Sequence, residues 1–188
     1  MRLIHHHRTP WFVALLLASA VGGPAAAESS GQAGSPAQQS PAMQLPRQKN
    51  PEPGRWVSGQ PGDDQLRSIA AFGIRHVINL RPPEEFPSEL AAAELGGLGV
   101  GYHRLPIHGA DDLTRENAEQ LDALLGKIGD EPTLLHCASG NRAGALMSLR
   151  AAWIQGLPVE EALELGRRYG LTGLEPVVRE KLSAAGKS

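Results

Sequence analysis

The sequence is poor in several features, and each shortage narrows the possible functions. It has one cysteine in 188 residues, so no disulfide can form within the chain. Aromatic residues make up only 4% of it, which leaves aliphatic side chains to fill the core. The formal net charge is −2 with no basic stripe, which argues against nucleic acid as a partner. No group of metal-binding residues has zinc-ligand spacing, and we expect no metal and no cofactor.

The apolar run near the N-terminus is too short to span a bilayer, but it has the layout of an export signal. Arg2 and Arg8 provide positive charge, residues 11–21 are apolar except for one serine, and three alanines at 25–27 form a cleavage site. We therefore expect residues 1–27 to be a signal peptide. The mature protein is then exported, to the periplasm, with no stable membrane insertion. The alternative is an uncleaved N-terminal anchor.

The rest of the chain divides by composition into a linker and one domain. Residues 28–53 are rich in Ser, Gly, Gln and Pro, which predicts a disordered linker. Residues 54–188 are enough for one catalytic domain with a real core. Apolar spacing there predicts strands and helices in alternation. The expected strands are 74–80, 100–105 and 133–136; the expected helices are 61–73, 88–95, 114–128, 143–155, one from 158, and 174–184. This order predicts an α/β fold with a central, mostly parallel sheet of about four strands flanked by helices.

One short loop carries most of the chemistry, and it lies between an expected buried strand and an expected helix. In open α/β sheets, ligands bind beyond the carboxyl ends of the strands, which is where this loop begins. Its backbone amides and the following helix N-terminus are suited to an anion, and its glycine permits the turn. An arginine adds a planar fork of donors for an oxyanion. The loop residues are His136, Cys137, Ala138, Ser139, Gly140, Asn141 and Arg142.

The same surroundings favour the thiolate form of Cys137, which makes it a candidate nucleophile. The alternative is an inert, buried core cysteine. His136 is a candidate for tuning this nucleophile through hydrogen bonds to the loop, or else a satisfied buried histidine. Arg81 follows an expected strand, where it either adds positive charge to the pocket or forms a salt bridge with Glu84 or Glu85.

Three segments carry a resemblance to a known family. His136-Cys137, Gly140 and Arg142 together resemble the signature loop of the cysteine-dependent phosphatases. With the segments 58–61 and 77–82, the loop is similar to a narrower group, the bacterial phosphatase-like domain of beta-lactamase-hydrolase-like proteins. The resemblance covers about residues 54–185. It implies a dual-specificity-phosphatase-like fold in which Cys137 attacks the substrate and Arg142 and the loop amides hold its oxyanion.

The resemblance also points to a general acid. Phosphatases protonate the leaving oxygen with an Asp from a separate loop, and Asp111 and Asp112 fall in the corresponding region of this chain. The alternative is that these two acids only favour the N-terminus of the next helix.

Two departures from the phosphatase pattern keep other functions open. Four residues separate Cys137 from Arg142, where protein phosphatases have five, and Ala143 stands where they have Ser or Thr. The shorter loop is similar in length to that of rhodaneses, which carry sulfur as a cysteine persulfide. The sequence therefore predicts a phosphatase-like hydrolase, a sulfurtransferase, or a non-catalytic anion- or partner-binding module. The expected partner is a small anionic or phosphorylated substrate, or a sulfane sulfur donor.

Overall fold

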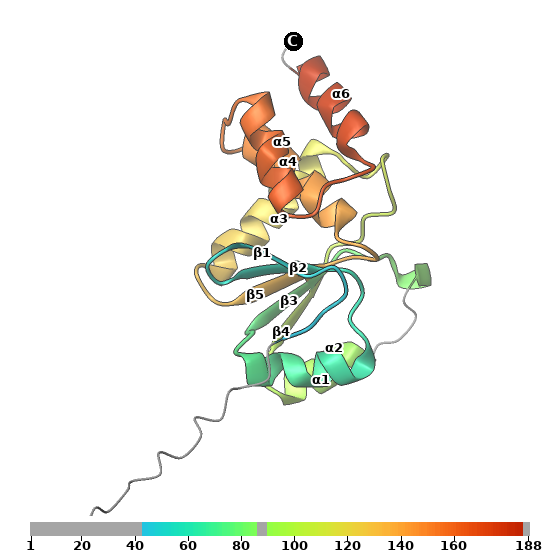
Figure 1. Ribbon diagram of the computed structural model, residues 1–188, viewed down its shortest axis with the longest axis vertical. Helices are drawn as coiled ribbons and strands as arrows, with labels where there is room; N and C mark the ends of the chain where they lie inside the picture. The colour runs from blue at the N-terminus through green and yellow to red at the C-terminus, as the bar shows by residue number, and fades with distance from the viewer. Residues whose placement is uncertain (1–42, 86–89, 186–188) are drawn as a thin grey trace, which may run out of the picture. The chain divides into compact units, whose positions relative to one another are not determined.

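The computed structural model describes residues 43–85 and 90–185, and these form a five-stranded sheet with helices on both faces (Figure 1). The strand order is β1-β2-β5-β3-β4, with only β1 antiparallel to its neighbour. The strands are β1 (Lys49–Glu52), β2 (Arg55–Ser58), β3 (His76–Asn79), β4 (Gly101–Arg104) and β5 (Thr133–His136). The predicted α/β class and mostly parallel sheet are confirmed.

The helices form two layers. One layer holds α1 (Asp63–Ile69) and α2 (Leu90–Gly97); the other holds α3 (Arg115–Ile128), α4 (Asn141–Trp153), α5 (Val159–Arg168) and α6 (Glu175–Ala185) (Figure 1). Two short 3-10 turns, Ala70–Phe72 and Pro83–Glu85, follow α1 and β3. Thr114 caps α3, as its position before the helix predicts, because its side chain accepts a hydrogen bond from the Asn117 amide at 3.2 Å.

The two layers bury two separate apolar clusters, and alternate residues of each central strand supply them. Val77 and Leu134 pack with α1 and α2, whereas Ile78 and Leu135 pack with the larger helical layer. All four residues of β5 are buried, because this strand lies at the centre of the sheet with both faces covered. The loop after β5 therefore starts from a fully buried, central strand.

The ordered domain begins earlier than the expected boundary at residue 54. Leu45 is buried, and β1 pairs with β2 in the segment predicted to be a linker. The linker prediction is therefore wrong for residues 43–53, where a polar strand gains its hydrogen bonds from the sheet edge. The predicted signal peptide and residues 28–42 lie outside the described part of the chain, as does residue 88, where the expected helix 88–95 begins.

Within residues 43–85 and 90–185, the helices are all too short or too polar to cross a membrane.

Candidate active site

The Cys137 loop joins the end of β5 to the start of α4 and is closely packed. Cys137 is 1% exposed, and the backbone amide of Gly140 donates a hydrogen bond to its sulfur at 3.1 Å. Gly140 has a φ of 88°, a left-handed conformation that suits glycine and lets α4 begin directly after it. The segment after α5 packs closely against the loop at Gly170. A Cβ at this position would lie only 3.1 Å from the Gly140 carbonyl oxygen.

Arg142 lies in the first turn of α4, and its guanidinium has three acceptors. Nη1 and Nη2 donate to the two carboxylate oxygens of Glu85 at 2.9 and 2.6 Å, and Nη1 also donates to the Ile107 carbonyl at 2.6 Å. Burial opposes its charge, but the Glu85 bond and the neighbouring Cys137 sulfur raise the pKa of Arg142. The hydrogen bond from Arg142 in turn lowers the pKa of Glu85, so both partners stay charged.

Arg81, two residues after the end of β3, contacts the same carboxylate. Its Nε donates to Glu85 at 3.3 Å, and its Nη1 donates to the Gln60 side chain at 2.8 Å. The predicted salt bridge of Arg81 to a following glutamate is thus present, and Glu85 is the partner. Glu85 therefore forms ion pairs with two arginines beside the loop. Its place in the sequence, shortly after two prolines, does not indicate this role.

His136 lies one residue before Cys137 and is fully enclosed. Burial, and next the positive charge of Arg81, lower the pKa of His136 to about 3, so the ring is neutral at physiological pH. Neither ring nitrogen has a hydrogen-bond partner in the part of the chain that the structure describes. The Cys137 backbone opposes these effects on the pKa of His136, and tuning of Cys137 by hydrogen bonds from His136 stays a prediction.

The other predicted loop residues surround Cys137, but two of them also hold the loop in place. The Ala138 carbonyl accepts from the Gln60 amide at 3.4 Å. The Asn141 side chain accepts from the Thr172 amide at 2.8 Å, which ties α4 to the segment before α6. Ser139 is half-buried and borders a groove. Substrate contacts by Ala138, Ser139, Gly140 and Asn141 stay predictions.

The two predicted acids lie in the loop between β4 and α3, with different surroundings. Asp112 accepts hydrogen bonds from the His108 amide at 2.7 Å and from His108 Nδ1 at 2.6 Å, and these lower the pKa of Asp112. His108 Nε2 lies 2.9 Å from a Glu84 oxygen, and its bond to Asp112 raises the pKa of His108. Asp111 is exposed. His108 belongs to no motif of the sequence, and only its contacts in the structure identify it.

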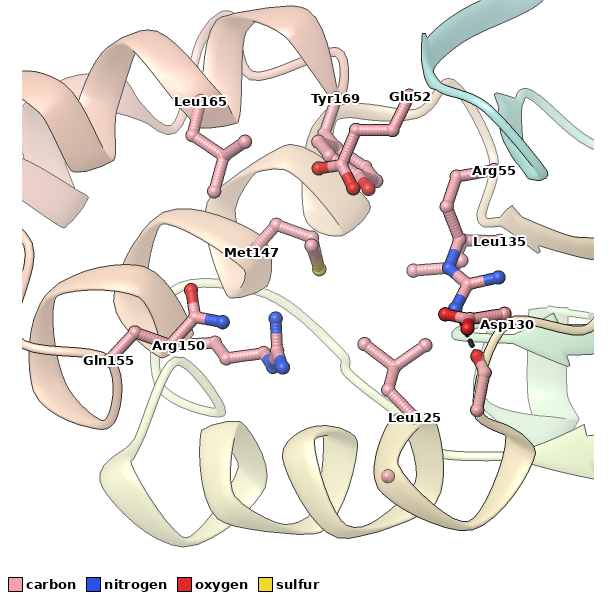
Figure 2. Close-up of a pocket in the computed structure, with 12 residues that line it drawn as sticks. Glu52, Arg55, Leu125, Asp130, Leu135, Met147, Arg150, Gln155, Leu165 and Tyr169 are labelled. Atoms are coloured by element: carbon pink, nitrogen blue, oxygen red, sulfur yellow. Dashed lines mark hydrogen bonds between the residues drawn. The ribbon is translucent and has the colours of Figure 1, made fainter. Parts of the chain in front are cut away.

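A separate cavity of about 330 Å³ lies between β1, β2 and helices α3 to α5 (Figure 2). Leu125, Met147 and Leu165 face one another across it. Its two arginines are already engaged: Arg55 donates to the Glu131 carbonyl at 2.8 Å, and Arg150 donates to an Asp122 oxygen at 2.8 Å. Neither Cys137 nor Arg142 lines this cavity. In the described residues, no group of three or more His, Cys, Asp or Glu side chains could hold a metal ion.

Comparison with curated proteins identifies homologues of this chain. It is 32% identical over 120 residues to the beta-lactamase hydrolase-like protein of Xylella fastidiosa (strain Temecula1), a match that covers 61% of this chain. The match covers 27% of that protein, so the chain spans about a quarter of the relatives it matches. No protein-family model matches the sequence.

Solved structures share the fold. A candidate phosphatase from Neisseria meningitidis Z2491 aligns with a TM-score of 0.60 and 29% identity, over 73% of this chain and 96% of that one. Tk-PTP in its active form aligns with a TM-score of 0.54 and 23% identity, over 75% of this chain and 99% of that one. The chain is thus homologous to one segment of the beta-lactamase hydrolase-like proteins and has the cysteine-dependent phosphatase fold, and both predictions are confirmed.

Proposed function

We propose that the protein is a cysteine-dependent phosphatase-like hydrolase that forms a covalent intermediate on Cys137. The observation that carries this proposal is the fixed Arg142, held by Glu85 and the Ile107 carbonyl beside the Cys137 sulfur. A prepositioned guanidinium loses little freedom when it binds an oxyanion, which favours stabilisation of a transition state. The phosphatase-like fold supports the same conclusion.

The reaction has two steps. The Cys137 thiolate attacks phosphorus and the bond from phosphorus to the leaving oxygen breaks, while Arg142 and the loop amides hold the remaining oxygens. The leaving oxygen takes a proton from the general acid. Water then attacks the phosphocysteine, the sulfur–phosphorus bond breaks, and the products are inorganic phosphate and the regenerated thiolate.

Asp111 is the better candidate for the general acid. Hydrogen bonds from His108 occupy the Asp112 carboxylate and lower its pKa, which makes it a poorer proton donor. Asp111 is exposed in the same loop, which also contains Ile107, whose carbonyl accepts a hydrogen bond from Arg142. The role of Asp112 is then to hold His108, which also pairs with Glu84.

The second candidate is a rhodanese-like sulfurtransferase, and two features of the loop favour it. It has four residues between Cys137 and Arg142, and the buried Ala143 has no hydroxyl to assist phosphocysteine breakdown. In this reaction Cys137 attacks the sulfane sulfur of thiosulfate, the sulfur–sulfur bond breaks and sulfite leaves. An acceptor thiol then attacks the outer sulfur of the Cys137 persulfide and releases the thiolate.

A paired assay separates the candidates. The wild-type protein and a Cys137→Ser control are given an aryl phosphate, and separately thiosulfate with a thiol acceptor. Cys137-dependent release of phosphate supports the hydrolase, and its absence refutes that proposal. Persulfide or sulfide formation supports the transferase. Failure of both reactions supports the third candidate, a non-catalytic anion- or partner-binding module.

We also propose that the protein acts in the periplasm, on the basis of the signal-like residues 1–27. Fractionation of cells that express the full chain tests this. A shortened protein in the periplasmic fraction is expected, and a full-length protein in the cytoplasm would refute export.

A further inference from the structure

A groove of about 350 Å³ borders the Cys137 loop, and neither Glu85 nor Arg142 lines it. Its lining includes Arg47, Lys49, Val57, Ser139, Gly140 and Thr172. Ser139 and Gly140 lie two and three positions after Cys137, so the groove and the loop share residues. The groove therefore adjoins the loop that holds the reacting group in the proposed function.

The walls of the groove are held in place by contacts from three parts of the chain. The Pro46 carbonyl accepts from the Gly59 amide at 2.7 Å, and Lys49 pairs with Val57 across β1 and β2. On the opposite wall, Thr172 donates its amide to Asn141 at 2.8 Å. These contacts therefore define the shape of the groove. One wall, residues 47–49, belongs to the segment that the sequence predicts to be a linker.

Two cations line the groove, and in the described part of the chain they have no partner of opposite charge. Arg47 and Lys49 are exposed, and neither takes part in an ion pair within residues 43–85 and 90–185. By contrast, Arg81 and Arg142 pair with Glu85. The first turn of α4, which begins after Gly140, also contains no acidic residue. The positive charge of the groove is therefore uncompensated by described neighbours.

We propose that this groove binds a second anionic group of the substrate, so that the protein acts on small molecules with at least two anionic groups. This inference rests on the proposed hydrolase function, in which the first anionic group reacts at Cys137. Arg47 and Lys49 contact the second group and raise affinity for the substrate without taking part in bond breaking.

The test compares phenyl phosphate with 1,4-phenylene bisphosphate, which differ by one anionic group. The full chain with Arg47→Gln and Lys49→Gln is measured beside a matched control, Arg75→Gln with Lys127→Gln, which removes two exposed cations that do not line the groove. The groove variant is expected to raise the KM of the bisphosphate about tenfold and that of phenyl phosphate less than about twofold, with kcat unchanged. The difference should shrink as salt rises from 50 to 500 mM. Equal effects on both substrates, or equal effects of both variants, would overturn the proposal.

A binding arm separates this inference from the proposed function. Each pair of substitutions is placed in a Cys137→Ser background, and both compounds are titrated by calorimetry. A selective tenfold loss of bisphosphate affinity without any turnover by the wild type would support the groove and refute hydrolysis. Turnover without selective binding would refute the groove and leave hydrolysis standing. Melting temperatures within about 2 °C of the parent confirm that the variants fold, as expected for exposed side chains.

Discussion

Two sets of cations lie around the Cys137 loop, and they differ in burial and in ion pairing. In the first set, Arg81 and Arg142 share the carboxylate of Glu85 and are largely buried. In the second set, Arg47 and Lys49 are exposed and have no ion pair in the described part of the chain. The paired cations are fixed before any ligand arrives, whereas the exposed ones are free to meet a ligand from solution.

Burial explains this difference. Arg142 is 9% exposed, and a buried guanidinium without a counter-charge would cost several kcal/mol. Glu85 and the Ile107 carbonyl remove that cost and fix the direction of the fork. Exposed cations keep their hydration and need no partner, so they add charge without precise geometry. This difference fits the two proposals above, in which Arg142 of the paired set holds the reacting group and the exposed set contacts a second anionic group.

The largest expected effect comes from Arg142→Lys. Lysine keeps the charge but cannot bond both Glu85 oxygens and an oxyanion with one planar fork. We expect kcat/KM for an aryl phosphate to fall about a thousandfold, the scale of losing an oxyanion donor. Arg150→Lys, which changes an arginine of α4 that pairs with Asp122, is the control. A similar loss in both variants would mean that the effect is structural.

Asp111→Asn tests whether the loop next to the paired set supplies the proton. Loss of a general acid lowers the rate about a hundredfold. Asp112→Asn changes the neighbouring residue, and because hydrogen bonds from His108 already occupy Asp112 and lower its pKa, we expect less than about a threefold change. Rates of aryl phosphate hydrolysis over pH 5 to 8 provide the measurement. The reverse ranking of the two variants would assign the proton to Asp112.

We expect His136, which lies near Arg81 of the paired set, to make the free energy of unfolding depend on pH. Its pKa is about 3 in the folded protein and about 6.5 when unfolded, so the unfolded chain binds more protons below pH 6.5. Its stabilising effect is complete above pH 6.5 and is lost as the pH falls toward 3. Between pH 7 and 5 we expect this group to remove about 2 kcal/mol of unfolding free energy.

Urea unfolding of a His136→Gln variant at both pH values measures this loss. The variant should lose about 2 kcal/mol less than the wild type on acidification. His108→Gln is the control with the opposite sign, because the pKa of His108 is raised and its effect is present at low pH. An unchanged pH dependence in the His136 variant would contradict the burial argument.

The smallest effect is expected from Glu85→Gln. Glutamine keeps a hydrogen-bond acceptor for Arg142 but loses the charge, so the fork is held less firmly. We expect kcat/KM to fall about tenfold, and Glu84→Gln, which removes an exposed contact to His108, to change it less than about twofold. An increase in rate would instead show that Glu85 competes with the substrate for Arg142.

Local patterns in the sequence were enough to predict much of the central scaffold. The buried run of β5, the threonine before α3 and the turn at Gly140 depend on neighbours within a few residues, and all three are present in the structure. The position of Cys137 between a buried strand and a helix follows from the same local signals. The sequence by itself therefore determined which residue is the candidate nucleophile.

Tertiary structure decided what surrounds that nucleophile. Glu85 meets Arg142 across 57 positions of sequence, and β1 finds its partner only at the edge of the assembled sheet. A polar segment such as 49–52 has no pattern that separates an edge strand from a linker, since its hydrogen bonds come from another strand. Which buried charges pair, and where exposed charges lie, depends on contacts between segments that are far apart in the sequence. A local sequence pattern contains no information about these contacts.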